Sequence, residues 1–347
     1  MDSKKHSHRR MRYAYVLVHF GSNAKYFELE LYFLIMLGRY AHRDIDLVYL
    51  YSEVDTPASF VKEIKPFVNK TIGFNDSGKT INVPEFASAY TSFNTLRTCD
   101  FMFAYELTDY DKICIVESDL VIMGNIDSVF NLRAPAILTY RGPEAEYNRH
   151  KLIRSSKEEA LAKCETGSTL NGGVMVIEPS KAKFAECLES LPIIVEKKCK
   201  YPNEALFEYV NPEFNNLPVE YNLSHYHTLK LHNYNIRDPR QVRVFHFNET
   251  DFKHLDIVKD TWFRDNINDP KVARKYAVKR IPIEYFENEF FLPNRDWVNS
   301  ILLKIENKRP GGIVEASHKH YGGTMTRRKN NVNRKKNKGK SKRVYKN

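Results

Sequence analysis

The sequence predicts an α/β fold: a single domain built around a mainly parallel central β-sheet. Near-continuous apolar runs at 13–20, 46–51 and 112–116 are typical of strands that are covered on both faces. Stretches with helical spacing of apolar residues separate these runs, and strands alternating with helices favour a parallel sheet. The 347-residue chain is 42% hydrophobic, which suffices for a sizeable core. In such a sheet, ligands bind beyond the carboxyl ends of the strands.

Turn signals separate the elements of the first 120 residues. Gly21-Ser22-Asn23 ends the first strand, Asp55-Thr56-Pro57 ends the second, and Asn75-Asp76-Ser77-Gly78 ends a third. A longer helical stretch precedes the buried strand KICIV. In chain order we predict strand 13–20, helix 25–41, strand 46–51, helix 58–65, strand 69–74, helix 88–107 and strand 112–116.

The second half of the chain carries shorter signals and ends in a polar tail. Apolar runs and amphipathic stretches predict strand 136–139, strand 173–177, helix 180–197, helix 203–211, strand 242–247 and helix 296–306. From residue 308 the chain is rich in Gly, Asn and Lys, a composition typical of disorder. We therefore predict a basic segment at 1–12, one domain at 13–307 and a disordered tail at 308–347.

The net charge of +11 belongs to that tail. Residues 327–347 contain eleven Lys and Arg and no acidic residue, so residues 1–326 carry 43 basic and 43 acidic groups. A neutral body excludes a basic, nucleic-acid-binding domain surface. Contact between the tail and nucleic acid or other polyanions remains an alternative function, because its cations can neutralise phosphates without sequence preference.

The cysteines and the N-terminus predict a cytoplasmic protein. The five cysteines are far apart and include no C-x-x-C pair, which favours reduced, buried thiols over a disulfide scaffold or zinc site. They are Cys99, Cys114, Cys164, Cys187 and Cys199. The N-terminus is polar and basic, and no apolar stretch long enough for a membrane anchor follows it. We therefore expect a soluble protein without signal peptide or membrane span.

The segment IVESDLVIMGNID, residues 115–127, carries the most informative pattern. Glu117 and Asp119 flank one residue at the end of an apolar strand, and residues two apart in extended backbone point the same way. A hard divalent cation prefers such carboxylate oxygens and can keep positions open for phosphate oxygens. The alternative is that the acidic pair only caps the strand or starts a turn. The flanking apolar residues and Asn125-Ile126-Asp127, which opens a predicted helix, favour the metal interpretation.

Four motifs follow one another along residues 13–255. They are ELTDYDKICIVESDLVIMGNIDSVF at 106–130, Asn171-Gly172-Gly173-Val174, Tyr221-Asn222-Leu223-Ser224, and Val244-Phe245-His246-Phe247 with Lys253 downstream. In this order they resemble glycogenin and related retaining glycosyltransferases of glycosyltransferase family 8. The resemblance implies a GT-A type fold and transfer of a hexose, with glucose the leading expectation, from a UDP-sugar with retention. It also implies a glycan or protein acceptor and favours a homodimer.

By this resemblance, Glu117, Asp119 and His246 are expected to bind the metal. An imidazole beside two carboxylates suits manganese better than magnesium, which stays the alternative. Considered alone, His246 is more simply explained as a structural histidine. The first acid is Glu where the family usually has Asp, and we expect metal binding to survive because Asp119 and His246 remain.

The resemblance also implies a donor-binding set. Val18 and Phe20 fit strand core equally well, and Lys253 fits an exposed surface lysine. Arg97 is expected to substitute for a family lysine whose register position is Phe101 here. The full expected set is Val18, His19, Phe20, Asn23, Arg97, Ser118, Gly173 and Lys253.

Four residues are expected around the transferred sugar: Gly173 and the three expected catalytic residues Asn171, Asn203 and Glu204. The family's acceptor-side D-Q pair appears here as Asn203-Glu204. A carboxylate at this position could stabilise an oxocarbenium-like centre or act as a nucleophile. The alternative is that Glu204 simply supports the first turn of a helix. A catalytically inactive relative is a further alternative, favoured by the departures at Glu117, Phe101 and Asn203.

Overall fold

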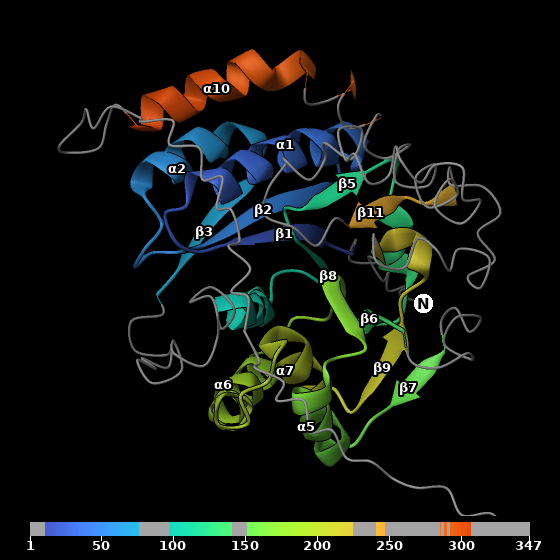
Figure 1. Cartoon of the computed structure of the whole chain (residues 1–347). Coiled ribbons are helices and arrows are strands. Elements are labelled where there is room, and N and C mark those ends of the chain that lie inside the picture. Colours follow the sequence, from blue (N-terminus) through green and yellow to red (C-terminus); the bar gives the residue numbers. More distant parts are fainter. Residues whose placement is uncertain are drawn as a thin grey trace, which may run out of the picture. The chain divides into compact units, whose positions relative to one another are not determined.

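An eight-stranded mixed β-sheet forms the centre of the fold (Figure 1). The computed structural model describes residues 11–75, 97–140, 151–224, 241–246, 285, 288–289 and 292–306. All of them belong to the first of two units into which the chain divides, Met1–Arg309 and Pro310–Asn347. The strands lie in the order β3-β2-β1-β4-β8-β6-β9-β7. Their bounds are β1 Tyr13–His19, β2 Ile45–Ser52, β3 Lys70–Phe74, β4 Lys112–Val116, β6 Ala136–Thr139, β7 Leu152–Arg154, β8 Leu170–Ile177 and β9 Glu213–Asn216.

The first four strands pair in parallel, as the alternation of strands and helices predicts. β1 lies between β2 and β4, and β3 follows β2. β8 runs antiparallel between β4 and β6, while β9 pairs parallel with β6 and antiparallel with β7. A smaller sheet joins β10 (Leu223–Ser224), β11 (Val244–His246) and β5 (Leu120–Ile122). The predicted α/β fold with a mainly parallel central sheet is confirmed.

Helices cover both faces of the sheet, which explains the near-continuous apolar strands. α1 (Ala24–Tyr40), α2 (Ala58–Ile64) and α10 (Leu292–Glu306) lie on one face, with α10 packed on α1 and α2 (Figure 1). α5 (Lys157–Thr166), α6 (Lys181–Glu196) and α7 (Pro202–Val210) lie on the other. Successive residues of a strand point to opposite faces of the sheet, and each face has its own hydrophobic core. In β1, Tyr15 and Leu17 pack in one core, and Ala14 and Val16 pack in the other.

Some predicted elements differ from those observed. Within the described part of the predicted helix 88–107, the backbone is a 3₁₀ helix, η2 (Thr98–Glu106), rather than an α-helix. Residues 99–105 are all buried, so their apolar pattern carries no helical period that could distinguish the two forms. Asp127 likewise begins a short 3₁₀ helix, η3 (Asp127–Asn131). The short strands β5, β7, β9 and β10 were not predicted, because two to four residues carry little periodicity. Helix α5 was also missed, although the capping box of Ser156 and Glu159 at its start is a sequence signal.

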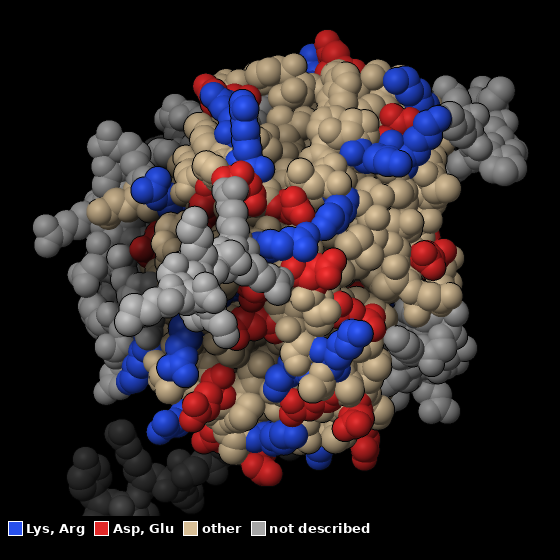
Figure 2. Space-filling view, turned by 180° about the vertical axis from the view of Figure 1, so that it is seen from behind, with Lys and Arg blue, Asp and Glu red and all other residues tan. Residues whose placement is uncertain are grey.

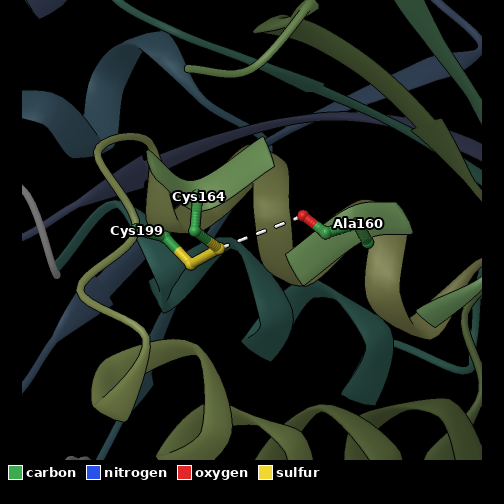
Figure 3. The surroundings of a disulfide bond; sticks show 3 residues. All are labelled: Ala160, Cys164 and Cys199. Carbon is green, nitrogen blue, oxygen red and sulfur yellow. Dashed lines mark hydrogen bonds between the residues drawn. A yellow bond between two sulfur atoms is a disulfide. The ribbon is translucent and has the colours of Figure 1, made fainter. Parts of the chain in front are cut away.

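The prediction that all five cysteines are reduced is wrong for two of them. Cys164, near the end of α5, forms a disulfide with Cys199, which precedes α7 (Figure 3). The other three cysteines are free and buried, as predicted. The two partners are 35 residues apart in the sequence, so no short motif marks them, and only the packing of α5 beside α7 brings them together.

The described surface carries both signs of charge. On the face shown in Figure 2, Lys and Arg side chains are interspersed with Asp and Glu, in agreement with the balanced composition of residues 1–326. No helix within the described ranges is long and apolar enough to cross a membrane.

Candidate metal and nucleotide site

The candidate site lies where the order of the parallel strands reverses. The chain runs outward from β1 through β2 to β3, and then returns to the other side of β1 as β4. Leu17 pairs with Val116, so the residues that follow β1 and β4 emerge at the same edge of the sheet. Ligands of open α/β sheets bind at such a reversal, because the loops from the two strand ends diverge there.

A pocket of about 210 Å³ opens at this edge. It brings together seven residues that were predicted for the site: Val18, His19, Phe20, Glu117, Ser118, Asp119 and Asn203. Its remaining lining is Tyr26, Glu30, Thr98, Phe101, Ile115, Val116 and Met175. The lining combines aromatic and aliphatic side chains with a few carboxylates, a composition typical of pockets that bind small molecules.

The three predicted metal ligands come together. One ligand atom from each of Glu117, Asp119 and His246 lies within 4.8 Å of the others. His246 Nε2 is 3.3 Å from Glu117 Oε2 and 3.2 Å from Asp119 Oδ1. Atoms this close can contact one common ion, and two carboxylates with an imidazole are a donor set that suits Mn²⁺. The residues present therefore fit a divalent cation.

The acidic pair lies in a turn rather than in the strand. β4 ends at Val116, and residues 117–119 lead into β5. The extended geometry that the sequence predicts for Glu117 and Asp119 is therefore wrong, although both carboxylates still converge. His246 reaches the two carboxylates because it pairs with Leu120, the residue after Asp119, across the antiparallel β5–β11 contact.

The electrostatics of this group favour a positive charge. Burial by itself lowers the pKa of His246, but the charge and hydrogen bond of Asp119, with those of Glu117, outweigh burial and raise it to about 10. In the absence of an ion, a proton on the imidazole thus balances the two carboxylates. A divalent cation would displace that proton, because the metal needs the Nε2 lone pair.

Two glycines allow this close packing. A Cβ on Gly173 would lie 2.4 Å from His246 Nδ1, and a Cβ on Gly172 would lie 2.8 Å from Asn203 Nδ2. Both belong to β8, and Gly173 O also accepts a hydrogen bond from the amide of Glu117. Because neither glycine has a side chain, Glu117, Asn203 of α7 and His246 of β11 can approach the backbone of β8 closely.

Asn171 contacts the Nδ1 side of the His246 ring, opposite the nitrogen that faces the two carboxylates. Its side-chain Oδ1 accepts hydrogen bonds from His246 Nδ1 at 2.9 Å, Asn222 Nδ2 at 2.8 Å and Gly173 N at 3.0 Å. Asn222 Oδ1 is also 3.0 Å from His246 Nδ1. Its side-chain oxygen is thus bound to the imidazole. That Asn171 also contacts the donor sugar stays a prediction.

Asn203 and Glu204 lie in the first turn of α7, where Asn203 lines the pocket. Glu204 is buried, and its Oε1 accepts a hydrogen bond from Gly172 N at 3.2 Å. Its Oε2 is buried without a hydrogen-bond partner of ordinary geometry among the described residues. Burial raises the pKa of Glu204 to about 8; nearby Ser168 opposes this rise and the charge of Glu117 adds to it. A buried carboxyl with a perturbed pKa beside a metal group is typical of a functional residue.

His19 holds the turn after β1 rather than reaching freely into the pocket. Its Nδ1 lies 2.6 Å from Glu30 Oε1, its Nε2 lies 3.0 Å from Gly21 O, and Tyr49 donates to Glu30 Oε2. Burial lowers the pKa of His19, but Glu30 outweighs burial and raises it. Gly21 has a φ of 84°, which glycine adopts without cost. Asn23 is exposed in the following turn.

Arg97 is bound by acidic neighbours. Its guanidinium donates to Asp55 at 2.9 Å and Asp100 at 2.7 Å, lies 5.4 Å from the centre of the Phe20 ring, and is 13% exposed. Arg97 therefore stabilises the wall of the pocket next to Phe20. Phe101, which occupies the position of the family lysine, lines the pocket itself. Lys253 lies outside the described residues.

Two polar residues of the site were not predicted. Glu30 is a buried acid in α1, a largely apolar helix that also contains Glu28, and an acid within such a segment is a signal that could have marked it. Asn222 belongs to a recognised motif, but nothing in its local sequence indicates that its side chain meets residues 51 positions earlier and 24 positions later.

Comparisons with known proteins agree with the motif resemblance. No protein-family model matches the chain. An uncharacterized protein of Acanthamoeba polyphaga mimivirus is 27% identical over 251 residues, 69% of this chain and 81% of that protein. UDP-glucuronate:xylan alpha-glucuronosyltransferase 1 of Arabidopsis thaliana is 31% identical over 87 residues, which span 25% of this chain and only 9% of the plant protein.

Three solved glycosyltransferase structures match the chain at low sequence identity. The galactosyltransferase LgtC matches with a TM-score of 0.44 and 11% identity over 77% of this chain and 95% of that chain. The glycosyltransferase GlyE of Streptococcus pneumoniae matches with a TM-score of 0.44 and 14% identity over 83% and 64% of the two chains. Mouse xyloside xylosyltransferase 1 matches with a TM-score of 0.40 and 12% identity over 69% and 98%.

Proposed function

We propose that this protein is a metal-dependent glycosyltransferase that transfers a hexose from a UDP-sugar to a glycan or protein acceptor with retention. The observation that carries the proposal is the group Glu117, Asp119 and His246 beside a pocket at the strand-order reversal. The ordered motifs and the 87-residue likeness to a plant glucuronosyltransferase support it. Glucose is the leading donor sugar, and glucuronate is the alternative that the plant relative suggests.

Each part of the site has a role in this reaction. The apolar pocket wall formed by Phe20, Tyr26 and Phe101 suits a nucleobase. A divalent cation held by the three metal ligands would offset the negative charge that develops on the departing diphosphate. In the transfer, the bond from the anomeric carbon to diphosphate breaks and the acceptor hydroxyl oxygen bonds to that carbon. The hydroxyl proton passes to the departing diphosphate.

Glu204 is the residue proposed to act on the anomeric carbon. Its Oε1 is held by Gly172 N, and its Oε2 makes no ordinary hydrogen bond within the described part of the chain. When ionised, this carboxylate stabilises positive charge at the sugar carbon or attacks it. The charge of Glu117 contributes to the raised pKa of Glu204, so neutralising Glu117 with a cation favours the ionised form.

A catalytically inactive, nucleotide-binding relative is the second candidate. The observation that favours it is Phe101, an apolar side chain in the pocket where the family has a lysine. Such a protein would bind UDP with Mn²⁺ and would release no UDP from any donor. The two candidates therefore differ in turnover and agree in metal-dependent binding.

The test is release of UDP from a panel of UDP-sugars that includes UDP-glucose and UDP-glucuronate, with Mn²⁺ or with EDTA. We expect Mn²⁺-dependent release from one donor, and loss of it in Asp119→Asn and His246→Ala. The matched controls are Asp44→Asn and His42→Ala, whose side chains are 47% and 65% exposed and lie outside the site. Both controls should keep wild-type activity.

The other outcomes are equally specific. Mn²⁺-dependent UDP binding without release, with glycan and protein acceptors present, would replace the transferase by the binding protein. Absence of both binding and release would overturn the proposal. Equal loss of activity in the exposed control variants would show that the assay reports folding rather than the site.

A further inference from the structure

We propose that Asn222 is a positioning residue that, together with Asn171, holds His246 with its Nε2 directed at the metal. The inference rests on the proposed metal site and adds to it a residue that touches neither metal nor substrate. It assigns a function to the asparagine of the Y-N-L-S motif, which the catalytic scheme above does not use.

The first step is the set of oxygen atoms around His246 Nδ1. Asn171 Oδ1 lies at 2.9 Å and Asn222 Oδ1 at 3.0 Å from this nitrogen. Both are acceptors, so Nδ1 must carry the proton in order to donate to them. The lone pair of the neutral ring then lies on Nε2, which faces Glu117 and Asp119 at 3.3 and 3.2 Å.

The second step is the orientation of the two amides. Asn222 Nδ2 donates to the backbone oxygen of Asn171 at 3.1 Å and to its Oδ1 at 2.8 Å. Gly173 N donates to the same Oδ1 at 3.0 Å. These donors turn the oxygen of Asn171, rather than its NH₂ group, toward the imidazole. Asn222 therefore acts twice, by accepting from the ring and by aligning the other acceptor.

The third step is that this arrangement is enclosed. Asn222, Asn171 and His246 are only 0%, 6% and 2% exposed, so no bulk water can replace a lost partner. Asn222 immediately precedes β10, which pairs in parallel with β11, while β11 pairs on its other edge with β5. The backbone of His246 is thus fixed between two strands, and the amides determine how its ring is presented. Partners of this kind commonly tune metal affinity.

The test compares Asn222→Ala with Asn211→Ala. Asn211, at the C-terminal end of α7, is a matched control because it is also a buried asparagine, 5% exposed. Its Nδ2 donates hydrogen bonds to the Tyr105 hydroxyl and to the backbone oxygen of Phe207. Mn²⁺ affinity of each folded variant is measured by titration followed by electron paramagnetic resonance, with thermal unfolding in EDTA as the measure of folding. We expect Asn222→Ala to weaken Mn²⁺ binding about 10- to 100-fold and Asn211→Ala to change it less than twofold.

A second measurement on the wild-type protein covers the case in which Asn222→Ala does not fold. In ¹⁵N-histidine-labelled protein loaded with diamagnetic Mg²⁺, His246 is assigned by its absence in His246→Ala. We expect a protonated Nδ1 and an unprotonated Nε2. The opposite tautomer, or unchanged Mn²⁺ affinity in folded Asn222→Ala, overturns the inference and leaves the proposed function standing. Lack of Mn²⁺ and Mg²⁺ binding by the wild type instead refutes the metal site itself.

Discussion

Replacing Gly173 with alanine gives the sharpest test of the metal geometry. A Cβ at this position would lie 2.4 Å from His246 Nδ1, 2.5 Å from His246 Cε1 and 2.9 Å from Asn222 Oδ1. The φ angle of Gly173 is not in the left-handed region, so alanine adds only this steric conflict. Ordinary contact requires about 3.5 Å, and the imidazole must therefore move by about 1 Å.

The displacement has two measurable consequences. Overpacking a buried site lowers the free energy of unfolding by about 1 to 3 kcal/mol. The ring also leaves the amide oxygens that orient it, and loss of such support weakens metal binding about 10- to 100-fold. We expect Gly173→Ala to show both effects, measured by urea unfolding in EDTA and by Mn²⁺ titration.

Gly38→Ala is the matched control. Gly38 lies in α1, and the nearest atom to an added Cβ is Leu47 Cδ1 at 4.0 Å. Alanine in a helix is more stable than glycine by about 0.5 to 1 kcal/mol, so this variant should gain stability and keep its Mn²⁺ affinity. If Gly173→Ala bound Mn²⁺ as tightly as the wild type, the position assigned to His246 in the metal group would be refuted.

Three further predictions follow from the buried ionisable groups and the disulfide. Burial raises the pKa of Glu204 from 4.5 to about 8, so its protonated form stabilises the fold fully below pH 4.5 and this contribution is lost as the pH rises through about 8. In EDTA, the unfolding free energy of the wild type should therefore fall relative to Glu204→Gln between pH 5 and 8, by up to about 1.4 kcal/mol per pH unit; parallel curves would contradict the burial of this carboxyl. The pKa of His246 is raised to about 10 by Asp119 and Glu117 against burial, so Mn²⁺ must displace a proton below that pH. Calorimetry in buffers of different ionisation enthalpy should detect about one proton released per ion at pH 7.5, and no release would argue against His246 as a ligand. Because the disulfide joins cysteines 35 residues apart, Cys199→Ala should lower the unfolding free energy of the oxidised protein by about 4 kcal/mol. Reductant should lower the unfolding free energy of the wild type by the same amount. A wild type whose stability does not change with reductant would contradict the disulfide.

Much of the fold could be predicted because its signals are local. Strands β1, β2, β3 and β4 each begin and end within one residue of the apolar runs that predict them. A strand buried on both faces must be apolar at nearly every position, and this requirement is visible without knowledge of its neighbours. The 3₁₀ form of η2 could not be predicted, since a segment buried on all sides loses the periodicity that identifies an α-helix.

Those residues of the candidate site that belong to recognisable motifs could be predicted from the sequence. Glu117, Asp119 and His246 were expected together from the order of four segments, and the ligand atoms do lie within 4.8 Å. Arg97 shows the limit of this reasoning. Its expected role in donor binding stays a prediction, and its contact with Asp55, 42 residues earlier in the chain, could not be read from the sequence around it.

The sequence by itself determined the α/β class, the neutral body with a basic tail, and which residues are proposed as metal ligands. The first two properties depend on composition and local patterns, and the third on the order of four short motifs along the chain. The tertiary structure alone decided that Asn222 faces His246, that Glu30 binds His19, and that Cys164 meets Cys199. Each of these contacts depends on how separate elements pack against one another. A side chain's own surroundings in the sequence hold no information about a partner that only folding brings within about 3 Å.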